Sequence, residues 1–200
     1  MEAIGSCHNI KRLMMRNLSF YRITDGGIKC LKGLRQLSSL KFSKLENVTS
    51  SAFCELFEKF HVGYLQKIHL SACDGLSSQV IKIIAVSCPN LIKIAIHQPK
   101  AVEQDLIKSD DILYLASRCI RLQSLDVRYT HISIGQALAE IISHLSVLNE
   151  FKYCPNSNPY DRDSLNTVYN YLLVNLRNFN VTLKCNFHMD KYLNGIRVKY

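Results

Sequence analysis

The sequence lacks the long apolar stretches that mark membrane-spanning and secreted proteins. No uninterrupted apolar run approaches the roughly 20 residues that a transmembrane helix needs. The N-terminal stretch MEAIGSCHNIKR also has no apolar segment of the kind found in signal peptides. We therefore expect a protein that resides in the cytoplasm, the nucleus or both, with no membrane partner.

Cysteine is present, but not in the patterns that bind metals or build a disulfide framework. The eight cysteines are scattered along the chain, and no two of them form a C-x-x-C pair. Cys7 and His8 are the only adjacent cysteine and histidine, which is weak support for a zinc site. In a reducing compartment, isolated cysteines usually serve as small buried hydrophobic residues, and we expect that role here. No metal and no other cofactor is predicted.

The motifs of the common enzyme classes are missing as well. There is no phosphate loop of the G-x-x-x-x-G-K type and no G-x-S-x-G nucleophile elbow. The histidines, including His69 and His97, have no acid or nucleophile at a characteristic spacing. The adjacent Asp110 and Asp111 are more typical of a helix start than of a metal site. We therefore predict that the protein is not an enzyme.

The composition is that of a folded protein with a basic surface. Hydrophobic residues make up 48% of the 200 residues and charged residues 20%, which suits one globular domain with a substantial core. The formal net charge is +9. A basic balance favours acidic partners, although it says nothing about the fold.

A short pattern recurs along most of the chain. It reads L-x-x-L-x-L, with any apolar residue at the three anchor positions. Such self-similarity at a nearly constant period is the signature of a repeat protein. The copies start at residues 10, 37, 65, 91, 122 and 148, with a less certain seventh at 176, so the spacings are 27, 28, 26, 31, 26 and 28 residues.

Each unit combines a short strand with a helix. The anchors alternate as buried positions of a strand do, and a polar helix opening such as TSSA at 49–52 follows. Stacked units would bury their apolar sides in a continuous core between a parallel sheet and a layer of helices. The predicted fold is an α/β solenoid with strands on its concave face and helices on its convex face. We assign residues 1–9 to the end of a preceding repeat, 10–181 to six or seven repeats, and 182–200 to a C-terminal cap.

The unit LQKIHLSACDGLSSQVIKIIAVSCPNL at 65–91 and the segment ITDGGIKCL at 23–31 resemble a known repeat class. They are similar to the cysteine-containing leucine-rich repeats of F-box/LRR proteins and of antagonist-of-mitotic-exit-network homologues. Cys73 is the only cysteine at the strand-end position of a unit, so the other units depart from the pattern. The matching residues of the third unit are Leu65, Ile68, Leu70, Cys73, Leu76, Cys88 and Leu91.

The resemblance implies a leucine-rich repeat horseshoe that recognises protein substrates for a Skp–cullin–F-box (SCF) ubiquitin ligase. No F-box is found in the sequence. Contact with the Skp adaptor and the cullin is therefore expected only through an F-box that this chain lacks. A mitotic-exit-antagonist-like protein, or a general repeat adaptor with no ligase role, is the alternative within the same class.

The outward strand positions of such a fold form rows on the concave face, two, four and six residues after each unit start. These rows are rich in lysine and arginine, with only Asp126 and Glu150 as acids. We predict a basic groove for an acidic or phosphorylated protein segment; the alternative is that these charges merely keep a sheet face hydrated. The candidate binding residues are Arg12, Arg16, Lys41, Lys67, His69, Lys93, His97, Arg128 and Lys152.

A second class of function is binding of nucleic acid or another polyanion by the same basic face. Base stacking would need aromatic residues, and the predicted rows contain no phenylalanine, tyrosine or tryptophan. Nucleic acid is therefore the less favoured partner. The longest spacing comes from residues 97–111, where Pro99 predicts a loop that either contacts a partner or is tolerated surface variation.

Overall fold

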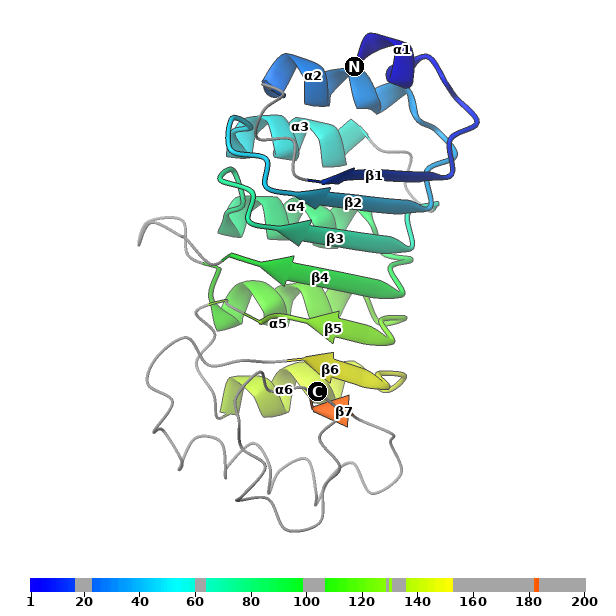
Figure 1. Cartoon of the computed structure of the whole chain (residues 1–200). Helices are drawn as coiled ribbons and strands as arrows, with labels where there is room; N and C mark the ends of the chain where they lie inside the picture. Colours follow the sequence, from blue (N-terminus) through cyan, green and yellow to red (C-terminus); the bar gives the residue numbers. More distant parts are fainter. Residues whose placement is uncertain are drawn as a thin grey trace.

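The structure is a computed structural model that describes residues 1–16, 23–59, 64–98, 107–128, 130, 136–152 and 182–183. Its centre is a seven-stranded sheet in which every neighbouring pair of strands is parallel. The order of the strands in the sheet follows their order in the chain (Figure 1). The predicted α/β class with a parallel sheet is therefore confirmed.

The first six strands each begin two residues after a predicted unit start. This agreement shows that the apolar anchors locate the strands correctly. The strands are β1 (Arg12–Arg16), β2 (Ser39–Ser43), β3 (Lys67–Ser71), β4 (Lys93–His97), β5 (Ser124–Asp126), β6 (Glu150–Lys152) and β7 (Thr182–Leu183).

From β1 to β6, helices connect successive strands, and they lie together on one side of the sheet (Figure 1). From α3 to α6, each helix packs against the next one along the chain. The helical elements are α1 (Glu2–Gly5), α2 (Asp25–Lys29), the 3₁₀ helix η1 (Cys30–Gly33), α3 (Ser50–Lys59), α4 (Ser78–Ser87), α5 (Ser109–Arg118) and α6 (Gln136–His144).

The core lies between the sheet and the helices. In β3 and β4 the anchor side chains Ile68, Leu70, Ile94 and Ile96 are all buried, as alternation along a strand requires. The helices supply the other half of the core at 3.6-residue spacing, for example with the buried Phe53 in α3. Burial of these two apolar layers is the main stabilising contribution to the fold.

Polar residues start the helices, largely as predicted. Ser77 precedes α4, and its hydroxyl accepts a hydrogen bond from the backbone N–H of Val80. In α5 the N-cap is Lys108, not a serine, and the Asp111 carboxylate accepts a hydrogen bond of 3.0 Å from the Lys108 N–H. The expectation that this acidic pair marks a helix start is therefore confirmed for Asp111.

The described cysteines divide into two groups. Cys73, Cys88 and Cys119 are buried as expected, and burial raises the pKa of Cys73 to about 11 and those of Cys88 and Cys119 to about 12. By contrast, Cys7 is exposed, and Cys30 and Cys54 are only half-buried, so the prediction of burial was wrong for these three. All the described cysteines have free thiols.

The described sheet ends at strand β7. Strand β7 pairs with β6, with Thr182 opposite Glu150, so the sheet reaches beyond residue 181 into the segment assigned to a cap. The predicted anchors of the seventh unit at 176–181 lie outside the described residues, as do residues 99–106 of the predicted loop. Within the described ranges, no helix is both long and apolar enough to cross a membrane.

Candidate functional site

The strand register brings the predicted binding residues together on one face of the sheet. The side chains that alternate with the buried anchors point away from the helices, and we call the surface they form the outer face. Its first row contains Arg12, Ser39, Lys67, Lys93, Ser124 and Glu150, paired in that order. The second row contains Met14, Lys41, His69, Ala95, Asp126 and Lys152. The third row contains Arg16, Ser43, Ser71 and His97.

The N-terminal half of the outer face carries cations that form no ion pair with a described residue, although the charge of Lys93 helps to lower the pKa of Glu150. Four of its cations are exposed and Lys41 is half-buried. Among the residues that the structure describes, no carboxylate lies within 4.0 Å of any of their nitrogen atoms. These unpaired cations are Arg12, Arg16, Lys41, Lys67 and Lys93.

The C-terminal half of the same face neutralises its own charges. Arg128 donates two hydrogen bonds to Asp126, of 2.9 Å from Nε to Oδ1 and 2.8 Å from Nη2 to Oδ2. The Nε2 atom of His97 lies 3.0 Å from the same Oδ1. Glu150 accepts a hydrogen bond of 2.6 Å from the Ser124 hydroxyl, and its other oxygen lies 2.8 Å from the Lys152 ammonium.

Both acids of this half are held in the ionised form. Burial by itself raises the pKa of Asp126, but the His97 ring and the Arg128 guanidinium outweigh it, so this pKa lies well below its usual range. The hydrogen bond from Lys152, together with that from Ser124, lowers the pKa of Glu150. Arg128 and Lys152, both predicted to bind a partner, are thus joined to acids of their own face.

The two histidines of the face are not exposed cations. The His97 residue is only 9% exposed, and its ring meets the His69 ring edge to face with 5.4 Å between the centroids. Burial lowers the pKa of His69 to about 4, with the nearby Lys41 charge as the second cause. His69 is therefore a neutral hydrogen-bonding group at pH 7. Among the described residues of the outer face, the lysines and arginines that form no ion pair all lie on β1 through β4.

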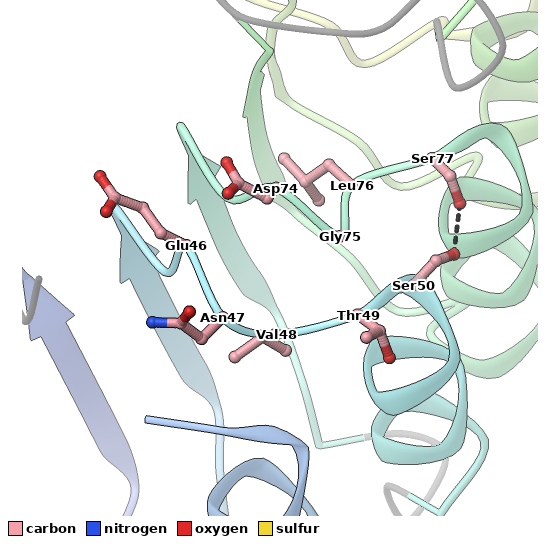
Figure 2. Close-up of a pocket in the computed structure, with 9 residues that line it drawn as sticks. All are labelled: Glu46, Asn47, Val48, Thr49, Ser50, Asp74, Gly75, Leu76 and Ser77. Carbon is pink, nitrogen blue, oxygen red and sulfur yellow. Dashed lines mark hydrogen bonds between the residues drawn. The ribbon is translucent and has the colours of Figure 1, made fainter. Parts of the chain in front are cut away.

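A second polar feature, which the sequence reasoning missed, connects the starts of successive helices. The Asp25 carboxylate accepts hydrogen bonds from the backbone N–H and the hydroxyl of Thr49, at 2.8 and 2.7 Å. One unit further on, the Ser50 and Ser77 hydroxyls lie 2.6 Å apart (Figure 2). Ser78 then donates a hydrogen bond to Asp111. The recurring polar openings signalled helix caps, but their contacts between units depend on the packing of the helices.

A shallow cavity of about 370 Å³ lies beside this row, between the loops at 46–50 and 74–77 (Figure 2). The loops approach closely at Gly75, where a Cβ atom would lie 2.3 Å from the carbonyl oxygen of Val48. The cavity is lined by two carboxylates, those of Glu46 and Asp74. Both lie at the end of the cavity that is farther from the Ser50–Ser77 contact (Figure 2). Among the described residues, no three histidine, cysteine, aspartate or glutamate side chains are grouped so that they could hold a metal ion.

Comparison with known proteins adds no assignment to this geometry. No family model matches the chain, and no curated protein is significantly similar to it.

Proposed function

We propose that the protein is an interaction scaffold that binds an acidic segment of a partner protein on the outer face of β1–β4. The observation that carries this proposal is the uneven distribution of charge. Arg12, Lys67 and Lys93 and their neighbours form no ion pair with a described residue, whereas Asp126 and Glu150 at the other end are paired. A surface with this polarity attracts acidic segments and repels basic ones.

The spacing of the cations suits an extended segment that crosses the strands. Lys67 and Lys93 are register partners on adjacent parallel strands, which lie about 4.8 Å apart. Because the two side chains leave the sheet at neighbouring positions, one carboxylate can contact both ammonium groups. The role is that of a binding surface, with no catalytic step.

The finer assignment that we propose is a leucine-rich repeat solenoid whose outer face is concave. The recurrence of the strand–helix unit, the strand order that follows the chain and the sequence resemblance of residues 65–91 support it. On this proposal, the protein acts like the substrate-recognition repeats of an SCF-type F-box/LRR receptor.

Charge reversal on the face tests the binding role. Tagged wild-type protein and the double variant Lys67→Glu/Lys93→Glu are used to capture proteins from a cell extract. We expect the wild type to retain acidic proteins that the variant loses. The control is Lys32→Glu/Lys108→Glu, which changes the net charge equally at two exposed lysines of the helical layer. Equal capture by all three proteins would contradict the proposal.

A separate experiment tests the ligase role. The chain, and a form extended upstream in its gene, are recovered from cells and probed for the Skp adaptor and the cullin. The ligase role is supported if the Skp adaptor and the cullin are recovered with the extended form and if other captured proteins are common to the two forms. Absence of the adaptor from both forms contradicts that role and leaves the general scaffold.

A further inference from the structure

Part of the outer face has the donors that a phosphate group requires. Two adjacent rows meet there over three adjacent strands, β1 to β3. Arg16, Ser43 and Ser71 are partners in the third row, and Lys41 and His69 are partners in the second row. With strands about 4.8 Å apart and rows two residues apart, these side chains share one small area. We call Arg16, Lys41, Ser43, His69 and Ser71 the donor cluster.

Every member of the donor cluster can donate a hydrogen bond, and none is an acid. Ser43 and Ser71 are half-buried, and their hydroxyls make no hydrogen bond with another described residue. The nearest part of the face that contains a carboxylate is the Asp126 group on β5, which Arg128 already occupies. The donors of the cluster are therefore available to an external acceptor.

The electrostatics of the cluster point in the same direction. Burial lowers the pKa of Lys41, and the positive charge of Arg16 lowers it further. The charges of Arg16 and Lys41 both also disfavour protonation of His69. The Asp126 charge acts on His69 in the opposite direction, but it is outweighed, so the ring stays neutral beside two cations. A bound dianion would relieve the repulsion between those cations.

Resting on the proposed function, we propose that the donor cluster is a subsite for a phosphomonoester on the acidic partner segment, namely a phosphorylated side chain. The planar guanidinium of Arg16 suits two phosphate oxygens, and Lys41 supplies a point charge. The two serine hydroxyls and the neutral His69 ring supply further hydrogen-bond donors. A phosphate group has three terminal oxygens to accept from them, whereas a carboxylate has only two and would leave some donors unused. The rest of the segment then continues towards Lys67 and Lys93 in the first row.

Peptide libraries separate phosphate recognition from general acid binding. Three fluorescent libraries share degenerate acidic flanks around one fixed residue, which is phosphoserine, glutamate or serine. Their binding to the full chain is measured by anisotropy. We expect the phosphoserine library to bind about tenfold more tightly than the glutamate library, the effect of one or two additional charge-assisted hydrogen bonds.

Variants assign that preference to the donor cluster. Arg16→Gln and Lys41→Gln should abolish the preference for phosphoserine over glutamate. The controls Lys67→Gln and Lys93→Gln should lower the affinity for the phosphoserine and glutamate libraries by the same factor. The ratio of the two affinities should therefore stay as in the wild type. A thermal unfolding curve for each variant shows that it is folded. Persistence of the preference in both Arg16→Gln and Lys41→Gln would overturn the subsite.

The remaining outcomes also decide the question. Equal binding of the phosphoserine and glutamate libraries to the wild type would overturn the subsite but leave the acidic-segment scaffold in place. Failure of all three libraries to bind would overturn both. Vesicles containing a phosphoinositide, inorganic phosphate and single-stranded DNA serve as competitors. Stronger binding of any of these than of the phosphoserine library would show that the phosphate is recognised on a different carrier and would overturn the proposal.

Discussion

Arg128 and Asp126 are joined by two parallel hydrogen bonds, of 2.9 and 2.8 Å, and the Asp126 residue is only 5% exposed. This pair separates the outer face into two parts with different chemistry. On the β5–β6 side the acids and cations satisfy one another, and on the β1–β4 side the cations remain unpaired among the described residues. On the proposed function, an acidic ligand would bind to the first four strands and not at Arg128.

Removal of the Arg128 side chain should destabilise the protein, because the Asp126 carboxylate stays buried and loses hydrogen bonds. Arg128→Ala removes the two guanidinium hydrogen bonds to the buried Asp126 carboxylate, so we expect a loss of about 2 kcal/mol in the free energy of unfolding. Urea unfolding of the wild type and the variant measures this loss. The double variant Asp126→Asn/Arg128→Gln removes the buried charge and should recover part of it. A loss below about 0.5 kcal/mol, which is typical of exposed pairs, would contradict the assignment.

Stability should fall as the pH drops through the mildly acidic range, because of His69. Its pKa is lowered from 6.5 to about 4 in the folded protein, so between these values the unfolded chain binds a proton that the folded chain does not. The contribution is thus fully present above pH 6.5 and is lost as the pH falls towards 4. His69→Gln should flatten the slope of unfolding free energy against pH in this window.

A control variant and a separate pH range distinguish the effect of His69 on the unfolding free energy from that of other groups. His144→Gln removes an exposed histidine from α6 and should leave the slope close to that of the wild type. Asp126 acts in a lower range, because its depressed pKa makes its contribution decline only as the pH falls below about 4, the usual value of a free aspartate. An unchanged slope between pH 6.5 and 4 in His69→Gln would show that the ring is not shielded as the structure indicates.

Gly75 should tolerate no side chain. A Cβ atom there would lie 2.3 Å from the Val48 carbonyl oxygen and 2.7 Å from the Ser50 backbone nitrogen, so the two loops must separate. We expect Gly75→Ala to cost about 1–3 kcal/mol in thermal or urea unfolding. Gly26→Ala is the matched control, since its nearest neighbour lies 4.0 Å away and alanine favours the helix. Equal stability of the two variants would contradict the close approach.

The contact between Ser50 and Ser77 should couple neighbouring units. Their hydroxyls lie 2.6 Å apart, and Ser77 also caps α4. Ser77→Ala should cost about 1 kcal/mol, in the range for loss of an N-cap. A double-mutant cycle with Ser50→Ala should give a coupling of about 0.5–1.5 kcal/mol, the value of one hydrogen bond. Additive effects of the two substitutions would show that the hydroxyls do not interact.

The sequence predicts the sheet well because the information lies in local periodicity. An anchor such as Leu37 or Leu65 sets where its strand begins, and equal offsets from successive anchors place Ser39 opposite Lys67. The three rows of the outer face follow from this rule wherever the strands are regular. The rule does not extend to β7, where Thr182 pairs with Glu150 although the offset from residue 176 would select residue 178.

The chemistry of individual residues on the face is harder to predict than their positions. His97 faces outward by alternation, yet it is buried because Asp126 and His69 lie against it. These contacts join side chains on neighbouring strands, and nothing in the period of the pattern shows which outward residues pair. The distinction between paired Arg128 and unpaired Lys67 therefore requires the structure.

The sheet adds its strands in the order of the chain, and this order has a consequence for how such a protein can vary. Removal or duplication of one internal unit would leave its neighbours in contact through surfaces of the same kind. The reach of the outer face would then change in steps of about 4.8 Å, one strand at a time. The donor cluster spans only β1 to β3, so on the proposed function a unit gained or lost beyond β4 would alter the length of the bound segment and leave the phosphate subsite unchanged.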